Sequence, residues 1–544
     1  MTWESDKDGY RSHGSWGAEG DIYIMFFDAK AMSEFFRDKE GTEIAKMLAG
    51  EDKKDEKKDS VKKVEKIKLD LEGREDRIFR LTRNSGRIGT HLLTDDGKKL
   101  LYIVRLESGY DLCSMDLEDK SVKVLKKGVY GFVPSPDGKY IYISTGGGIS
   151  KMNVNGGESK SISYAGEYEY KPKAERQYIF DHMWKQVKEK FYDPDLHGVD
   201  WDYYKENYRK FLPYINNDFD FAELLSEILG ELNASHTGGR YRYSSGLNFG
   251  TLGVLYDNDY QGDGLKIKEV LPDGALSIAD CEIKAGDIIT SIDGKQIKAG
   301  EDWYQLLTGK AGKKTAITVK KGGKKETELY VTPSYSDNAL LYRRWVKERE
   351  AKVKDLSGGR LGYVHVQGMD SPSFREVYSK ALGKYRTADA LIVDTRHNGG
   401  GWLHDDLVTF LGGKDYVNYQ PRGRFIGKDP YSKWSKPSCV LVCEDNYSDA
   451  CGFPYAYKAL GIGKLIGAPV AGTMTAVWWE YQINSSIIFG IPQVGFWCID
   501  EGHYSENHQI EPDILVYNDP ASVLRGEDKQ LEAAVKELLS ETTK

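Results

Sequence analysis

Cysteine is scarce in this sequence, and long apolar runs are absent. Only 6 of the 544 residues are cysteine and no two form a CxxC pair, so neither a zinc motif nor a redox motif is indicated. No apolar stretch approaches the roughly 20 residues of a membrane span. Net charge is −8 and the basic residues are dispersed, unlike the basic stripe of a nucleic-acid binder. We therefore expect no metal, no cofactor, no nucleic-acid partner and no membrane span.

What is present indicates a large folded protein. A chain of 544 residues predicts three or four domains at roughly 100–200 residues each. Apolar content of 40% and aromatic content of 12% are typical of a folded chain, and 36 Tyr and 58 Gly favour β-structure and tight turns. The first residues do not read as a signal peptide, which leaves the compartment open.

Residues 1–165 carry a repeat. TDDGKKLLYI at 94–103 returns 41 residues later as SPDGKYIYIS at 135–144, and a degenerate third copy lies near the start. A period near 40–45 residues with four short strands is typical of propeller blades. Because only two or three blades fit, we expect the chain to begin inside a propeller; the alternative is an irregular β-domain. The charge run at 51–66 predicts a solvated insertion.

Residues 166–247 change to helical spacing. The clearest helix covers 220–232, where apolar residues recur on one face, and Asp220 and Glu223 have the spacing of a capping box. Ser-His follows this helix. His236 alone is typical of a charge partner at a helix end.

Residues 248–335 resemble a PDZ domain. The resemblance lies in GTLGVLYD, in a Gly-Ala pair expected to start a helix, and in the AGDIITSIDG hairpin. PDZ domains bind extended peptides along a sheet edge, and such a domain can also serve only as a spacer or gate.

Residues 336–544 alternate strands and helices. Short apolar runs predict strands at 362–366, 390–396, 438–444 and 463–467. The pattern predicts an α/β layered domain with a mostly parallel sheet.

One polar turn interrupts this domain. The run Cys439–Cys443 predicts a buried strand and Asp449–Leu460 a helix, which places Ser448 at a strand-to-helix turn where a hydroxyl can stand clear of the sheet. Alone, the pattern is more typical of a helix N-cap than of a nucleophile.

Four islands decide between these interpretations. They are Ser-His at 235–236, DTRHNGGG at 394–401, YSD at 447–449 and SENHQIEPDI at 505–514. In this order, with a PDZ-like domain between the first two, they resemble the tricorn protease family, which is related to the tail-specific processing proteases. The resemblance implies a multidomain fold with a β-propeller remnant, a helical subdomain, a PDZ domain and an α/β, crotonase-like catalytic domain.

The resemblance also implies roles for single residues. It makes Ser448 the nucleophile, His236 the general base and Glu506 the acidic end of the relay, with Ser235 linking or orienting it. The oxyanion of the tetrahedral intermediate would be bound by backbone N–H groups of Asp449 and of Gly399 or Gly400.

Rival candidates lie nearby. Cys451 would sit inside the helix, and His508 is close enough to Glu506 to compete as a base. Asp513 is typical of a turn residue. Further histidines and carboxylates flank the islands without the spacing of a metal motif: His397, His404, Asp405, Asp406 and His503.

The predicted function is that of a serine peptidase that hydrolyses oligopeptides without a cofactor. The resemblance implies peptide substrates, a homo-oligomer, expected to be a hexamer, and a cytoplasmic location, with export possible if the natural N-terminus lies upstream. Tyr447 before the serine and His508-Gln509 after Glu506-Asn507 depart from the family pattern and leave substrate preference open. The alternative is a non-catalytic scaffold that binds peptides through the propeller and PDZ domains.

Overall fold

The computed structural model consists of two compact units, Met1–Tyr170 and Lys171–Lys544. Within the part of the chain it describes, no helix is long and apolar enough to cross a membrane. The charge run at 51–66, predicted to be a solvated insertion, lies outside the described residues. The described residues are 1–11, 17–37, 39–48, 70–107, 109–243, 246–277, 282–322 and 325–542.

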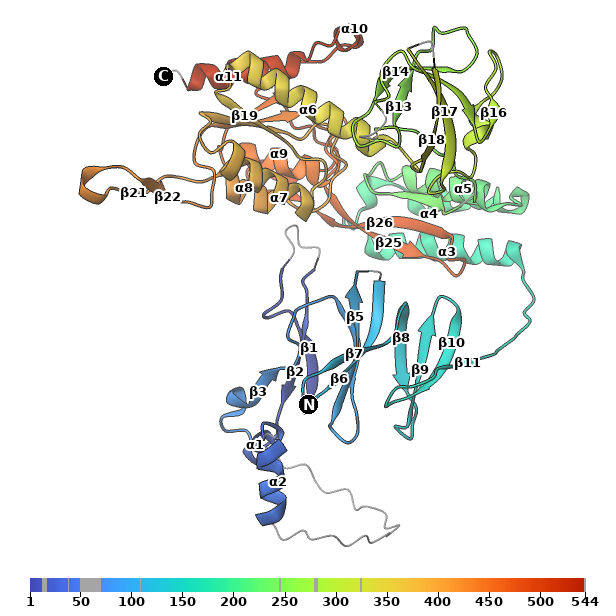
Figure 1. The fold of residues 1–544 in the computed structure, drawn as a ribbon, viewed down its shortest axis with the longest axis vertical. Coiled ribbons are helices and arrows are strands. Elements are labelled where there is room, and N and C mark those ends of the chain that lie inside the picture. The colour runs from blue at the N-terminus through green and yellow to red at the C-terminus, as the bar shows by residue number, and fades with distance from the viewer. Residues whose placement is uncertain are drawn as a thin grey trace. The chain divides into compact units, whose positions relative to one another are not determined.

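The N-terminal unit contains two four-stranded antiparallel sheets in which each strand pairs with its neighbour in sequence (Figure 1). The first holds β4 (Ile88–Leu93), β5 (Lys99–Leu106), β6 (Gly109–Asp116) and β7 (Val122–Lys126). The second holds β8 (Val129–Pro134), β9 (Tyr140–Thr145), β10 (Gly148–Asn153) and β11 (Lys160–Ile162).

The sequence repeat is also a structural repeat. In the first copy the Thr94 hydroxyl donates to Asp96 Oδ1 at 2.6 Å, and in the second the Ser135 hydroxyl donates to Asp137 Oδ1 at 2.6 Å. In each copy the Asp-Gly turn feeds the second strand of a four-stranded sheet. Such side-chain bonds to a nearby turn are what Ser, Thr and Asp supply where a chain reverses.

The start of this unit differs from the expectation of β-structure throughout. Its three-stranded sheet, β1 (Thr2–Ser5), β2 (Asp21–Met25) and β3 (Ile78–Arg80), is interrupted between β2 and β3 by helices α1 (Ala29–Phe35) and α2 (Lys39–Leu48). Asp28 caps α1 by accepting from the N–H of Ala31 at 2.8 Å. Helix α1 was not predicted because it is short and its apolar residues follow closely on the alternating strand pattern that ends near Phe26, against which they pack.

The second unit begins with helices α3 (Pro172–Lys190), α4 (Trp201–Arg209) and α5 (Asp218–Gly230). They share a core with a sheet of order β12-β26-β25, made by β12 (Gly238–Tyr241), β26 (Ile487–Gly495) and β25 (Thr475–Tyr481). This sheet joins the segment after the Ser-His pair to a segment some 250 residues later.

The predicted capping box of α5 is wrong. Asn217 is the N-cap, and its side chain accepts from the N–H of Asp220 at 2.9 Å. The helix therefore begins earlier than the apolar stripe suggests, since an Asn ahead of Asp218 caps it as well as the predicted pair would.

The PDZ-like segment forms a sheet of order β13-β14-β15-β17-β18, with β16 paired to β15. The predicted hairpin is confirmed as the turn between β15 and β16. Where a helix was expected to start at Gly274-Ala275, the described residues up to Ser277 form turns, and residues 278–281 lie outside the described part. The strands are β13 (Val254–Tyr256), β14 (Leu265–Val270), β15 (Ile288–Ile292), β16 (Lys295–Gln296), β17 (Thr315–Lys321) and β18 (Lys325–Val331).

The remainder is a three-layer α/β/α domain around a five-stranded, fully parallel sheet. The sequence predicted an α/β layered domain with a mostly parallel sheet. The strands, in spatial order, are β19 (Leu361–His365), β20 (Ala390–Asp394), β23 (Ser438–Val442), β24 (Lys464–Gly467) and β29 (Ile514–Leu515). Helices α6 (Asn338–Ser357) and α11 (Lys529–Glu541) cover one face, and α7 (Ser371–Ser379), α8 (His404–Leu411) and α9 (Asp449–Ala459) cover the other (Figure 1).

Smaller elements decorate this domain: β21 (Val417–Tyr419), β22 (Gly427–Asp429), β27 (Trp497–Cys498), β28 (His503–Tyr504) and α10 (Pro520–Leu524). Because β20 and β23 are neighbours and parallel, the loops after their carboxyl ends meet at one edge of the sheet. Those loops are the glycine loop, which we define as the DTRHNGGG segment at 394–401, and the turn that holds Ser448.

Candidate active site

Ser448 lies at the turn between β23 and α9. Its backbone has φ 58° and ψ −126°, a conformation that a residue with a Cβ adopts only where the surroundings hold it, as at a nucleophile turn. Ser448 occupies the N-cap position, yet its hydroxyl makes no capping hydrogen bond, and its backbone N–H donates to Thr473 Oγ1 at 3.1 Å. The predicted helix start is confirmed, and the hydroxyl is not used for capping.

The glycine loop packs directly against this turn. Gly400 has φ +98°, and a Cβ added to it would lie 2.5 Å from the Cβ of Ser448, so only glycine fits there. The Gly400 N–H donates to Asn398 Oδ1 at 2.8 Å. The backbone N–H groups of Gly399 and Asp449 donate to no described residue. They are therefore available to an incoming group.

A buried ion-pair network anchors the loop. Arg396 donates to Asp394 Oδ2 at 2.7 Å and to Asp528 Oδ1 at 2.9 Å. Burial disfavours the charged carboxylate, but the Arg396 guanidinium outweighs it and lowers the pKa of Asp394 to about 2. The Asp and Arg of DTRHNGGG thus hold the loop in place.

A relay runs from Glu506 to His236. The Ser235 hydroxyl donates to Glu506 Oε2 at 2.9 Å and lies 2.8 Å from His236 Nδ1. The Ser235 backbone N–H also donates to Glu506 Oε1 at 2.5 Å. Because the Ser235 hydroxyl donates its proton in a hydrogen bond to the Glu506 carboxylate, its oxygen accepts from His236 Nδ1–H. This leaves His236 Nε2 as the unprotonated, basic nitrogen.

Burial sets the charges of this relay. Glu506 is only 3% exposed, and burial raises its pKa even though the hydrogen bonds from Ser235 act the other way. Burial also lowers the pKa of His236 to about 4. The imidazole is therefore neutral at pH 7, the state that a general base requires.

Two residues to which the sequence assigned no role, Thr475 and Tyr447, complete the relay's surroundings. Thr475 Oγ1 lies 3.0 Å from His236 Nδ1 and 3.3 Å from the Ser235 hydroxyl. Tyr447 OH accepts from the backbone N–H of His236 at 2.7 Å, and the two rings are 4.7 Å apart. The role of Thr475 was missed because Thr475 lies on β25, 239 residues after His236 in the sequence. The role of Tyr447 was missed because Tyr447 stood out only as a departure from the family pattern.

The structure thus brings the expected residues together in two groups. Ser235, His236 and Glu506 form one, and Ser448, Asp449 and the glycine loop form the other. No hydrogen bond joins the Ser448 hydroxyl to the His236 imidazole, and the Tyr447 hydroxyl connects the two groups. In substrate-free sites such a bond is often long and shortens only when substrate binds.

The structure gives no support to Cys451 as the nucleophile or to His508 as the general base. Cys451 is fully buried, and burial raises the pKa of its thiol to about 12, so it is not an accessible thiolate. His508 Nδ1 bonds the backbone carbonyl of Glu506 at 2.9 Å, and its ring stacks on His503 at 3.8 Å. Asp513 accepts from the N–H of Leu465 at 2.8 Å, a structural bond at the sheet.

His404 turns to Asp449. Its Nδ1 lies 2.5 Å from Asp449 Oδ1, and its backbone N–H donates to Asp449 Oδ2 at 3.0 Å. Burial disfavours the imidazolium, but the Asp449 carboxylate outweighs it and raises the pKa of His404. The Asp449 side chain thereby fixes the start of α8. Only the backbone N–H of Asp449 is then left for a ligand.

Comparison with known proteins defines the class. Family models match in chain order: the tricorn protease C1 domain at 172–230, the tricorn protease PDZ domain at 250–335 and peptidase family S41 at 360–516. The last of these matches places residues 360–516 in peptidase family S41.

The first two of these matches are domains of the tricorn protease, which confirms the resemblance to the tricorn protease family seen in the sequence. The chain is 30% identical over 441 residues to tricorn protease homolog 1 of Streptomyces coelicolor, covering 77% of this chain and 41% of the relative. It is 26% identical over 447 residues to the tricorn protease of Thermoplasma volcanium, covering 80% and 43%.

A solved structure shares the fold. The crystal structure of the tricorn protease matches with a TM-score of 0.80 at 20% identity, covering all of this chain and 54% of that one. The chain spans less than half the length of the two curated relatives named above.

Proposed function

We propose that the chain hydrolyses peptide bonds of oligopeptides through a Ser448–His236–Ser235–Glu506 relay. The observation that carries the proposal is the unbroken set of hydrogen bonds from Glu506 through Ser235 to His236 Nδ1. This set selects the tautomer whose Nε2 can take a proton from a serine hydroxyl.

The chemistry follows from these positions. Ser448 Oγ attacks the substrate carbonyl carbon while its proton passes to His236 Nε2, and the carbonyl oxygen becomes an oxyanion. When the peptide C–N bond breaks, the leaving amine takes that proton. Water then hydrolyses the acyl-enzyme by the same two transfers and restores Ser448.

The oxyanion needs preorganised donors, and the structure supports two. The N–H groups of Asp449 and Gly399 make no hydrogen bond within the described part of the chain, whereas the Gly400 N–H is held by Asn398. Of the two glycines considered from the sequence, Gly399 is thus the better donor. Loss of one such donor typically costs about 3 kcal/mol of transition-state stabilisation.

The domain assignment belongs to this proposal. We assign 1–165 to propeller blades, supported by the two four-stranded antiparallel sheets, and 166–247 to a helical subdomain that carries Ser-His. Residues 248–335 form the PDZ domain, and 336–544 the crotonase-like catalytic domain. Peptide substrates, a homo-oligomeric, hexameric assembly and a cytoplasmic location complete the proposal by resemblance to the family.

Peptide cleavage by the full chain tests the function. Ser448→Ala is expected to abolish turnover, while Ser540→Ala, a matched change on the exposed side of α11, leaves it unchanged. Full turnover by Ser448→Ala would refute the assignment. Tight peptide binding by a wild-type chain that cleaves nothing would support the alternative, a non-catalytic scaffold.

A further inference from the structure

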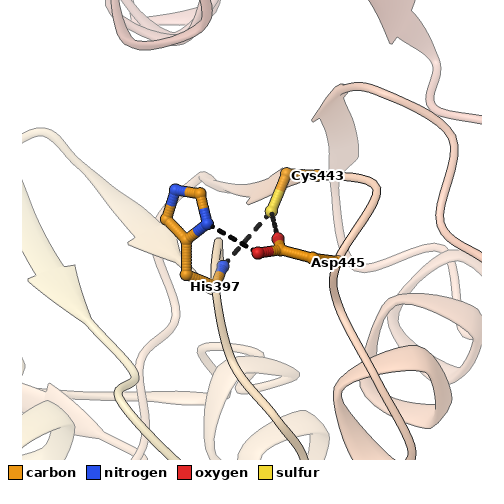
Figure 2. Close-up of side chains that lie close together, drawn as sticks. All are labelled: His397, Cys443 and Asp445. Carbon is orange, nitrogen blue, oxygen red and sulfur yellow. Dashed lines mark hydrogen bonds and ion pairs between the residues drawn. The ribbon is translucent and has the colours of Figure 1, made fainter.

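We propose that His397, Cys443 and Asp445 form a binding site for a transition-metal dication of the zinc class. Figure 2 shows the imidazole, the thiol and the carboxylate gathered at one point. His397 Nδ1 lies 2.9 Å from Asp445 Oδ2, the Cys443 thiol donates to Asp445 Oδ1 at 2.7 Å, and the three ligand atoms lie within 4.8 Å of one another.

These separations suit a tetrahedral ion. With metal–sulfur bonds of about 2.3 Å and metal–nitrogen or metal–oxygen bonds of about 2.0 Å, ligand atoms lie roughly 3.3–3.5 Å apart. The nitrogen–oxygen distance of 2.9 Å needs to open by about 0.4 Å and the sulfur–oxygen distance of 2.7 Å by about 0.8 Å. The imidazole and the thiol, whose ligand atoms lie within 4.8 Å of each other, need to come to about 3.5 Å. On binding, the Cys443 thiol gives up its proton to solvent and coordinates as thiolate, because metal ligands must be deprotonated.

The set is chemically selective and open to solvent. Imidazole, thiolate and carboxylate together favour zinc over magnesium or calcium, which prefer oxygen ligands. Cys443 is 4% exposed, whereas the side chains of His397 and Asp445 are 61% and 64% exposed. An ion can therefore enter from the solvent side and keep a water molecule as its fourth ligand.

The backbone prepares the site. His397 has φ 64°, an uncommon conformation for a residue other than glycine, and it turns the side chain toward Asp445. The His397 N–H donates to Cys443 Sγ at 3.2 Å, a bond that would stabilise a metal-bound thiolate. Sequence spacing gave no signal because the ligands come from two loops 46 residues apart.

The location ties two loops together. His397 immediately precedes Asn398 of the glycine loop, and Asp445 lies three residues before Ser448. A bound ion would link the loops that carry Gly399 and the nucleophile turn. Binding itself does not depend on whether the chain cleaves peptides.

Cobalt and zinc titrations of the chelator-treated full chain test this site. We expect one Co²⁺ per chain with a thiolate-to-metal absorption band, displacement by Zn²⁺, and a rise in melting temperature with zinc. His397→Ala, an exposed change, and Cys443→Ser are each expected to weaken zinc binding more than about 10-fold and to remove or shift the band. The matched controls His91→Ala and Cys439→Ser should bind as wild type.

Absence of a stoichiometric site would overturn the proposal. So would binding that His397→Ala leaves unchanged, a result that stands even if Cys443→Ser fails to fold. Loss of the band in Cys439→Ser alone would also overturn it, since the metal would then sit on another thiol.

Discussion

The substitution Glu506→Gln tests the relay at its acidic end. In the structure, one carboxylate oxygen accepts from the Ser235 backbone N–H and the other accepts from the Ser235 hydroxyl. A backbone N–H cannot reverse its role, so the carbonyl oxygen of the introduced amide must face it and the amide NH₂ must face the hydroxyl. Ser235 then accepts from the amide and turns its own proton toward His236 Nδ1.

That reversal moves the imidazole proton to Nε2, the nitrogen that should receive the Ser448 proton. In a serine protease triad, the equivalent acid-to-amide change costs about 10⁴-fold in kcat through the wrong tautomer. Here the effect passes through one more hydroxyl, so we expect a loss of about 10³-fold, or about 4 kcal/mol of transition-state stabilisation.

Steady-state cleavage of a fluorogenic peptide measures this effect. KM should change little, because Glu506 is buried behind the relay, and the melting temperature should stay close to wild type since the amide has the same shape. Glu501→Gln, an exposed carboxylate in the same segment that pairs with His503, is the control. A folded Glu506→Gln with kcat within about threefold of wild type would show that the relay does not select the tautomer.

Three further outcomes are expected. Gly400→Ala, which forces a Cβ against Ser448, should lower kcat at least about 10-fold, since small displacements of a nucleophile are costly; unaltered kcat would show that the loop yields. Burial lowers the pKa of His236 to about 4, so kcat/KM should stay constant as the pH falls through 6.5 and should decline only near pH 4, where the imidazole protonates. A decline centred at pH 6.5 or above would contradict this effect of burial. Arg396→Leu leaves Asp394 buried without its ion-pair partner, whereas Asp528 keeps Arg349, whose Nε lies 3.4 Å from Asp528 Oδ2. The change should cost about 3–5 kcal/mol in urea unfolding, and a loss under about 1 kcal/mol would mean that the network is not anchoring the loop.

The local and periodic features of the fold could be predicted from sequence. The strand at Cys439–Cys443 and the helix after Ser448 follow from an apolar run and a polar turn, and the repeats at 94–103 and 135–144 follow from a fixed period. Both signals are local, because burial of a whole strand or recurrence of a turn is written in neighbouring residues.

Features that depend on distant segments could not be predicted. Thr475 reaches His236 because β25 and the segment after α5 join one sheet, a pairing that no spacing in the chain reveals. The cluster of His397, Cys443 and Asp445 depends on two parallel strands ending side by side. Helix α1 was missed because it has only 7 residues, too few for its apolar residues to show a helical period.

Covalent labelling tests the central claim most directly. A fluorophosphonate probe added to the full chain should form one adduct, located by peptide mass spectrometry on Ser448, and the labelling rate should fall sharply in Glu506→Gln and in His236→Ala. An adduct elsewhere, or a folded wild-type chain that takes no label, would contradict the assignment of Ser448 as the activated nucleophile.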